Sequence, residues 1–318
     1  MDKIIIDISV VICTFNRATL LDKTLSSFLQ QENLDNISWE LIVVDNNSTD
    51  NTKDVIEEKI NVFNNKLIYV FEPIQGLNSA RNRGVQESHG KIVAFTDDDV
   101  VISRNWLNTI KRGFQKYNVD GLGGKVLPIG DIKYPDWFIK DGLYRIGGVL
   151  VERDLGEMVK TLKQNELLPI GANMSFKKEV FYKFGMFNLE KTYIAKKKPI
   201  WVGTDTWFIQ RIIRQGAKIL YLPDMIIYHP IPTERFNKRY LKNWYFNLGR
   251  SFISNKGKLR GRRFLGIPLY LYKQIVLSFF KWLLCIVMYK KRIGFYFRLQ
   301  FLQNLGSIYE CLINRSLQ

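Results

Sequence analysis

The sequence predicts an α/β fold built on a doubly wound, mostly parallel β-sheet. Over about the first 100 residues, short apolar runs alternate with helix-like segments of about 10–15 residues, which is typical of βαβ units. The first run, residues 4–13, is apolar on both faces, as buried parallel strands are. Three of these runs end in polar clusters, at residues 14–17, 45–47 and 97–99. Ligands in such sheets bind at the carboxyl ends of the strands, so the three clusters are expected to meet at one edge.

The elements of the first half follow from this alternation. Leu21, Leu25 and Phe28 recur at helical spacing, and Gly90 ends the helix expected over residues 78–89. We expect strands at residues 4–13, 39–44, 67–71 and 92–95, and helices at residues 17–31, from 48 to about 60, and 78–89.

The second half is less regular. Residues 166–176 are expected to lead through Gly171-Ala172-Asn173 into a helix over residues 178–184. Gly216 is the expected C-cap of a helix over residues 205–215, and a last strand over residues 217–228 precedes His229.

Asp97, Asp98 and Asp99 form the most informative cluster. Adjacent carboxylates raise each other's pKa unless positive charge lies among them, and no Lys or Arg stands between Lys91 and Arg104. A divalent cation that also holds substrate phosphates would supply this charge, because hard cations bind carboxylate oxygens. The alternative is an acidic turn or a helix cap.

The charge of the chain is unevenly distributed. Residues 231–318 hold 17 Lys and Arg against 2 acids, a net charge of +15, so residues 1–230 carry only 17 − 15 = +2. The three cysteines are scattered, which argues against a disulfide framework and fits a reducing compartment. The N-terminus is typical of a strand and not of a secretion signal. The P-loop, the dinucleotide-binding glycine pattern and the serine-hydrolase elbow are absent from the sequence.

Four motifs in this order resemble the family 2 glycosyltransferases of GT-A fold. They are VVICTFNR at residues 10–17, IVVDNNSTD at 42–50, GLNSARNRG at 76–84 and FTDDDV at 95–100. The resemblance implies a nucleotide-diphosphate sugar as donor, most often a uridine one, with Mg²⁺ or Mn²⁺ as cofactor. It also implies an acceptor-side subdomain beside the nucleotide-sugar-binding half.

The resemblance assigns roles to residues of the first half. Asp45 would accept a hydrogen bond from uracil, Asp97 would face the ribose, and Asp99 would bind the metal. Thr14, Asn16, Arg17, Arg81 and Asp98 would complete the nucleotide site. From the residues alone, Asp45 is also a candidate helix N-cap, Asn16 a turn residue and Arg81 a solvated helix residue.

A second part of the site is expected near residues 201–208. This stretch resembles the Gly-Glu-Asp segment of the family. Thr204 replaces the Glu, and Asp205 stands at the position of the Asp. Asp205 is the expected general base of an inverting transfer, with a helix cap as the alternative. His229 is a candidate metal ligand, and a structural histidine is the alternative.

The C-terminal region carries a strongly apolar helix pattern over residues 267–289, with Lys273 and Lys281 on a polar stripe. Basic clusters at 256–263 and 290–292 flank it. Two internal lysines favour a helix lying in a membrane interface over a spanning one. We therefore expect a peripheral or monotopic protein on the cytoplasmic face of the plasma (inner) membrane, bound to its anionic surface. The alternative is a helix that packs on the catalytic domain or on another subunit.

Together these expectations divide the chain into three parts. Residues 1–120 form the nucleotide-sugar-binding half, residues 121–230 the acceptor-binding and catalytic half, and residues 231–318 a helical membrane-associating tail. The predicted activity is transfer of a hexose or N-acetylhexosamine to a glycan or lipid-linked acceptor.

Three other functions fit the sequence less well. A sugar-phosphate nucleotidyltransferase needs a Gly-rich loop after the first strand, which is missing. A nucleic-acid-binding protein is suggested by the pI of about 9.6, but the basic residues bracket an apolar helix, so no nucleic acid is expected. A catalytically inactive scaffold is suggested by Thr204 and opposed by the intact aspartates.

Overall fold

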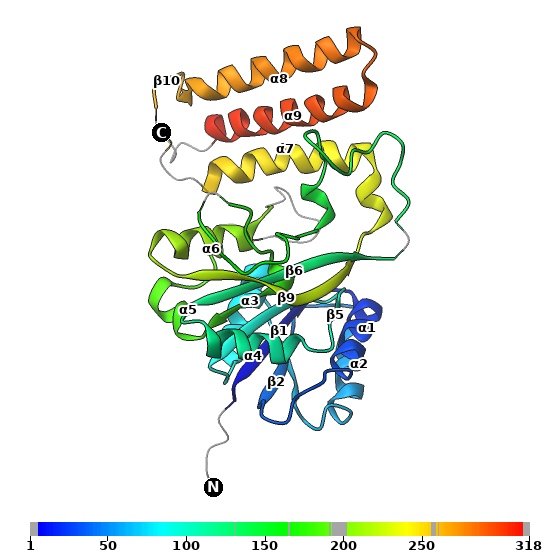
Figure 1. Cartoon of the computed structure of the whole chain (residues 1–318), viewed down its shortest axis with the longest axis vertical. Helices are drawn as coiled ribbons and strands as arrows, with labels where there is room; N and C mark the ends of the chain where they lie inside the picture. Colours follow the sequence, from blue (N-terminus) through cyan, green and yellow to red (C-terminus); the bar gives the residue numbers. More distant parts are fainter. Residues whose placement is uncertain are drawn as a thin grey trace. The chain divides into compact units, whose positions relative to one another are not determined.

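The computed structural model describes residues 6–130, 132–164, 166–190, 192, 202–255, 259 and 261–313. The chain divides into two compact units (Figure 1). Unit 1 comprises residues 1–130, 152–195 and 204–230, and unit 2 comprises residues 131–151, 196–203 and 231–318. The separate functions predicted for residues 1–120, 121–230 and 231–318 stay predictions.

Unit 1 begins with alternating strands and helices, as the sequence predicts. They are β1 (Ile8–Thr14), α1 (Ala18–Phe28), β2 (Trp39–Asp45), α2 (Thr52–Ile60), β3 (Leu67–Phe71), α3 (Leu77–Glu87), β4 (Ile92–Asp97), β5 (Val101–Ile102) and α4 (Trp106–Lys116). The second half adds β6 (Gly121–Ile129), β7 (Lys160–Thr161), a 3₁₀ turn η2 (Gly171–Asn173), β8 (Met174–Lys177), α5 (Glu179–Phe184), α6 (Thr204–Arg214) and β9 (Ile219–Pro230).

These strands form one sheet in the order β3-β2-β1-β4-β8-β6-β9-β5, with β7 paired to β9. The pairs β1–β2, β2–β3, β1–β4 and β6–β9 are parallel. β8 runs antiparallel to both β4 and β6, so β6 keeps the direction of β4. The predicted fold class, an α/β fold built on a doubly wound, mostly parallel sheet, is confirmed.

Successive residues of the central strands face opposite helical layers. Val10 and Ile12 pack in a core that includes α1, α2 and α4, whereas Val11 packs in a core that includes α3, α5 and α6. Because both faces are covered, an alternating polar residue would be buried without a partner, which explains the continuous apolar runs.

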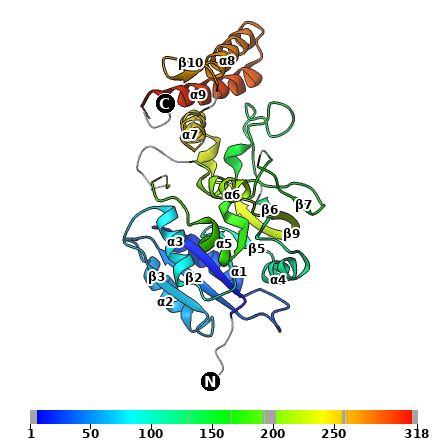
Figure 2. The same ribbon diagram turned by 90° about the vertical axis from the view of Figure 1, so that its left-hand side faces the viewer.

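Unit 2 is mainly helical. It contains η1 (Gly148–Leu150), η3 (Thr233–Phe236), α7 (Lys238–Asn255), a short hairpin of β10 (Arg263–Phe264) and β11 (Ile267–Pro268), α8 (Leu269–Val287) and α9 (Lys291–Ile313). Helix α9 packs against both α7 and α8 (Figure 2). Glycines allow a close crossing of α7 and α9, because a Cβ on Gly306 would lie 2.0 Å from the Phe246 carbonyl oxygen.

Candidate active site

The acidic triplet lies at the carboxyl end of β4. In the sheet register, Cys13 pairs with Asp97, and Thr14 pairs with Asp45, so the ends of β1, β2 and β4 lie at one edge. The turn after β4 is fixed from α1, because the hydroxyl of Thr24 bonds both the N–H (3.0 Å) and the carbonyl (2.9 Å) of Val100. Asp98 and Asp99 are thereby held in buried positions.

Arg17 supplies positive charge to this cluster. It precedes α1, and its Nη1 lies 2.9 Å from Asp98 Oδ1 and 3.0 Å from Asp99 Oδ2. Along the chain, the Lys and Arg residues nearest to the triplet are Lys91 and Arg104. The structure shows that the β1–α1 loop provides one from about 80 residues away, so charge repulsion within the triplet alone does not require a metal.

One cation does not neutralise three carboxylates. Burial raises the pKa of Asp97 to about 6, with the charge of Asp99 adding to the rise and that of Arg81 opposing it. Burial also raises the pKa of Asp98 to about 6, although Arg17 favours its ionised form. The site therefore retains a capacity for further positive charge.

Asp97, Asp99 and His229 fit the ligand set of a divalent cation. One ligand atom from each lies within 4.8 Å of the others. His229 Nδ1 lies 2.6 Å from the Pro230 carbonyl oxygen and donates to it, which directs Nε2 toward Asp99 Oδ1, 3.3 Å away. Among the described residues, that buried oxygen accepts no hydrogen bond. Two carboxylates and an imidazole fixed by a carbonyl form a donor set that suits Mn²⁺.

Asp45 is held by the turn that follows β2. Its Oδ1 accepts from Ser48 N (2.9 Å) and its Oδ2 from the Tyr69 hydroxyl (3.2 Å). Burial and the Asp45 charge raise the pKa of Tyr69 to about 12, so this phenol stays a donor. The N-cap of α2 is Asn51, so Asp45 is not that cap. Tyr69 was not predicted from the sequence, where its only signal is a hydroxyl in the middle of an otherwise apolar strand.

Asn16 joins two loops. Its Oδ1 accepts from Thr49 N at 2.7 Å, and its own N–H donates to Ser48 Oγ at 2.9 Å. Its φ of +53° is one that asparagine adopts more readily than most residues. The contacts of Asn16 are thus those of a turn residue. Its contact with a nucleotide stays a prediction.

Arg81 and Asp205 meet at Gly171. The N–H of Gly171 donates to Asp205 Oδ2. A Cβ on Gly171 would lie 2.0 Å from Arg81 Nη2 and 3.2 Å from Asp205 Oδ2. Arg81 is only 4% exposed and lies over the ring of Phe187, so it is not the solvated helix residue of the alternative interpretation. The charges of Arg81 and Asp205 both act on the pKa of Asp97, which links this group to the triplet.

Asn173 ends the same 3₁₀ turn but has a structural role. Its Nδ2 donates to the carbonyls of Lys125 (2.9 Å) and Met225 (2.7 Å), and its Oδ1 accepts from Trp106 Nε1 (2.9 Å). It is fully buried, at the register shift between β6 and β9. The backbone N–H of Gly171 is therefore the part of this turn that reaches the site.

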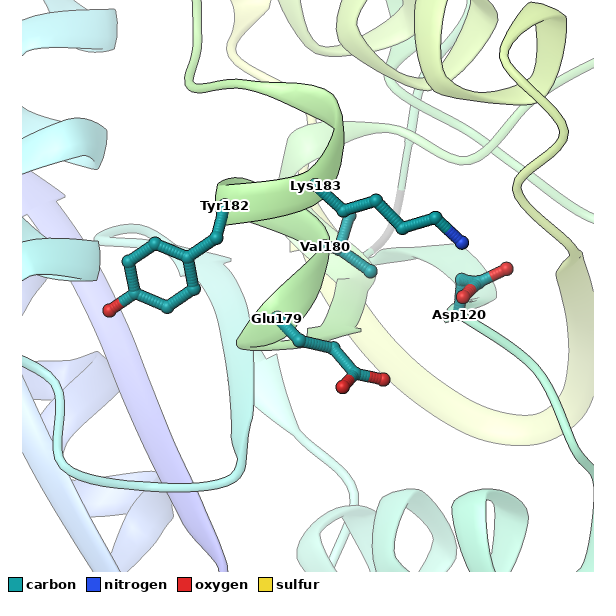
Figure 3. A pocket seen from close by; sticks show the side chains of 5 residues that line it. All are labelled: Asp120, Glu179, Val180, Tyr182 and Lys183. Carbon is teal, nitrogen blue, oxygen red and sulfur yellow. The ribbon is translucent and has the colours of Figure 1, made fainter.

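The predicted site residues thus gather at one sheet edge, while a separate hollow lies elsewhere. A cavity of about 440 Å³ is lined by Asp120, Glu179, Val180, Tyr182 and Lys183, beside the starting end of β6 (Figure 3). In Figure 3 the Lys183 amino group points toward the Asp120 carboxylate. None of the predicted site residues lines this hollow. Trp201, the first residue of the predicted second motif, lies outside the described residues.

The fold is that of the GT-A glycosyltransferases, as predicted, with acidic side chains at the carboxyl edge of its mostly parallel sheet. The model of the glycosyl transferase family 2 matches residues 9–185, and the chain belongs to this family.

Among curated proteins, the chain is 32% identical over 129 residues to glycosyltransferase AglE of Haloferax volcanii, a match that covers 41% of each chain. It is 27% identical over 237 residues to the glucosyl-dolichyl phosphate glucuronosyltransferase of the same organism, covering 70% of this chain and 69% of that one. The match thus spans less than half the length of AglE.

Solved structures share the fold. The mannosyltransferase PcManGT from Pyrobaculum calidifontis, in complex with GDP-Man and Mn²⁺, has a TM-score of 0.56 at 18% identity. That similarity covers 78% of this chain and 62% of that one. Residues 1–349 of TarS from S. aureus, in complex with UDP, give a TM-score of 0.54 at 15% identity, covering 93% and 90% of the two chains.

Proposed function

We propose that the protein transfers a hexose or N-acetylhexosamine from a nucleotide-diphosphate sugar, a UDP-sugar, to a hydroxyl of a glycan or lipid-linked acceptor, with inversion. The observation that carries the proposal is the gathering of Asp97, Asp99 and His229 within ligand distance, with Asp205 near enough to act on the pKa of Asp97. Family membership and the nucleotide complexes of the fold relatives support it. The relative named as a glucosyl-dolichyl phosphate glucuronosyltransferase supports a lipid-linked acceptor in surface polysaccharide or glycolipid synthesis.

In this proposal the donor binds along the carboxyl edge. Asp45, oriented by Tyr69 and Ser48, accepts the imide N–H of uracil. Asp97 faces the ribose, and Arg81 contributes positive charge toward the diphosphate. Thr14, Asn16, Arg17 and Asp98 form the surrounding wall.

Mn²⁺ or Mg²⁺ would be held by Asp99 and His229, with Asp97 beside them. When bound, such a cation supplies charge that stabilises the departing diphosphate. Arg17 already pairs with Asp99 Oδ2, so Oδ1 is the oxygen that Asp99 offers on the side of His229.

Asp205 acts as the general base. It lies in the first turn of α6, and the Gly171 N–H fixes one of its carboxylate oxygens. It takes the proton of the acceptor hydroxyl as the acceptor oxygen bonds to the anomeric carbon. The bond from that carbon to the diphosphate breaks on the opposite face, so the configuration inverts and the nucleotide diphosphate leaves with the bonding electron pair.

The proposal also places the protein at the anionic cytoplasmic face of the plasma (inner) membrane, as a peripheral or monotopic protein. The basic C-terminal region supports this location. Helix α8 is long and apolar enough to cross a membrane by length and composition. Binding of RNA in place of anionic lipid would favour the nucleic-acid alternative.

The test is a screen of the purified protein against nucleotide sugars with Mn²⁺ or Mg²⁺, with release of nucleotide diphosphate as the readout. We expect turnover of one class of donor only when the cation is present, and its loss in D99N. The control is D224N. Asp224 is exposed on β9, and its replacement by asparagine changes the charge by the same amount as D99N does. Folded protein that turns over no donor, or D99N that keeps full metal-dependent turnover, would contradict the proposal and favour an inactive scaffold.

A further inference from the structure

Helix α8 exposes most of its large apolar side chains, whereas a helix packed on a protein core would bury them. The residues that it buries are Leu271, Ser278 and Cys285, which recur every seven positions. Large apolar side chains on the outward face remain exposed, among them Phe280 (60%), Leu284 (57%) and Val287 (68%). Leu269, Val276, Leu277 and Leu283 extend this exposed set over the length of the helix.

The inward face of α8 is partly polar and is bound to α9. Asn304 Nδ2 donates to Ser278 Oγ at 3.1 Å and to the Gln274 carbonyl at 3.2 Å. The rings of Trp282 and Phe301 also meet at 6.0 Å, and the guanidinium of Arg298 lies 5.2 Å from the Trp282 ring. A helix that left α9 to span a bilayer alone would lose these contacts and would place Ser278 in hydrocarbon.

The charge around this face has one sign. The sequence has no acid between Glu234 and Glu310, a stretch that includes Lys273, Lys281, Lys290 and Lys291. Glu310 is buried and bonds Arg250 at 3.0 Å, so its charge is neutralised within unit 2. In the part of the chain that the structure describes, the exposed face of α8 is therefore apolar over most of its length, with Lys273 on it near one end of the helix and Lys290 and Lys291 beyond the other.

We propose that this face of α8 lies flat in the interface of an anionic bilayer, with α9 holding the helix parallel to the surface. The 19 residues of α8 would cover about 28 Å at about 1.5 Å per residue. Apolar side chains enter the acyl boundary, and the lysines pair with anionic headgroups. The benefit of this orientation, access to a lipid-linked acceptor, rests on the proposed function. The geometry of the exposed face depends on unit 2 alone.

The first experiment measures co-sedimentation of the full chain with vesicles of phosphatidylcholine, either pure or containing about 30% of the anionic lipid phosphatidylglycerol. We expect binding to the anionic vesicles that falls with salt. In F280E/L284E we expect binding to fall at least ~10-fold, because each charge must enter the apolar boundary. The matched control, V62E/Y182E, adds the same charge at exposed apolar positions of unit 1 and should bind like the wild type.

Each other outcome contradicts the inference. Equal binding of F280E/L284E and wild type would show that this face does not meet lipid. A wild-type dimer that F280E/L284E dissociates, with no vesicle binding, would assign the face to a second copy of the chain. Circular dichroism of both double variants checks that they fold. Release of nucleotide diphosphate from the donor is expected to be unchanged in F280E/L284E, so loss of vesicle binding with intact turnover separates this inference from the proposed function.

The second experiment separates a flat helix from a spanning one. The variants V276C, F280C and V287C are labelled with an environment-sensitive fluorophore and quenched by lipids that carry spin labels at shallow or deep positions. A flat helix places all three labels at the same shallow depth. A spanning helix places them at graded depths, and that gradient would overturn the proposal. Wild-type chain treated in the same way controls for labelling of the native cysteines, two of which are buried.

Discussion

Asp97 and Asp98 lie in surroundings that favour their protonated forms. Burial is the main cause, and it raises the pKa of each from the ordinary 3.8 to about 6. The native state therefore holds protons that the unfolded state releases between pH 4 and 6. Stability falls as pH rises through this window, because the native state must give up these protons.

This linkage predicts a pH-dependent response to metal. Without added metal, the melting temperature should be higher near pH 5 than at pH 7.5. Mn²⁺ should raise it more at pH 7.5, where both carboxylates are ionised, because binding no longer competes with protons. Thermal unfolding with and without Mn²⁺ at the two pH values tests this. D99N should show a much smaller response, and an equal metal response at both pH values would contradict the linkage.

Asp205 is the residue whose replacement should separate binding from chemistry. D205N keeps the size of the side chain and an acceptor for the Gly171 N–H, but it cannot take a proton. We expect transfer to fall by roughly 10²- to 10⁴-fold, the usual contribution of a general base, with donor affinity little changed. Calorimetric binding of UDP with Mn²⁺ and the rate of transfer measure the two effects.

The control for this variant is E57Q, a neutralisation of an exposed residue on α2. If D205N lost UDP binding in parallel with transfer, Asp205 would be part of the donor site and not the base.

The individual site residues were predictable to different degrees. The motifs indicated the acidic triplet, Asp45 and Asp205 because each ends a strand or opens a helix. The pairing of Arg17 with Asp98 and Asp99 spans 81 and 82 positions. No pattern in a single sequence reports such a separation, since the fold alone brings the two loops together.

At the scale of elements, the first four strands were predictable, as were β9 and the helices α5 and α6, whereas β8 was not. Strands β1 to β4 are apolar runs separated by helices, and they obey simple rules of alternation. β8 has four residues, and its place between β4 and β6 depends on pairing with strands remote in sequence. Short strands of this kind carry too few residues for a periodic signal.

Asn173 is expected to fix how η2, α4 and the β6–β9 pair fit together. N173L would leave two buried carbonyls and the Trp106 N–H without their bonds. We expect a loss of about 3–5 kcal/mol in the free energy of unfolding, typical of a broken buried network. Urea unfolding measures it. N105A removes an exposed bond to Asn33 and should cost under about 1 kcal/mol, and a comparable loss in both variants would refute a special role for Asn173.

At the scale of the whole molecule, charge and packing divide the chain in similar ways. The sequence carries a net charge of +2 over residues 1–230 and +15 over residues 231–318. The excess of basic residues thus falls almost wholly in the C-terminal part, from which α7, α8 and α9 of unit 2 are built. The assignment of residues 131–151 to unit 2 was not predictable, because their contacts with α7 and α9 depend on aromatic side chains such as Phe138 and Tyr245, which lie about 100 positions apart.

Since each unit has its own cores, ligands of the two proposed sites should protect different amides from hydrogen exchange. UDP with Mn²⁺ should slow exchange in the segments that follow β1, β2 and β4 and at the start of α6, with little change in α8. Anionic vesicles should slow exchange in α8 and at its basic ends, with little change at the sheet edge. Mass spectrometry of the full chain resolves both regions in one sample. Protection of α8 by the nucleotide, or of the β4 turn by vesicles, would show that the two sites are energetically coupled. That result would contradict the separate roles proposed for them.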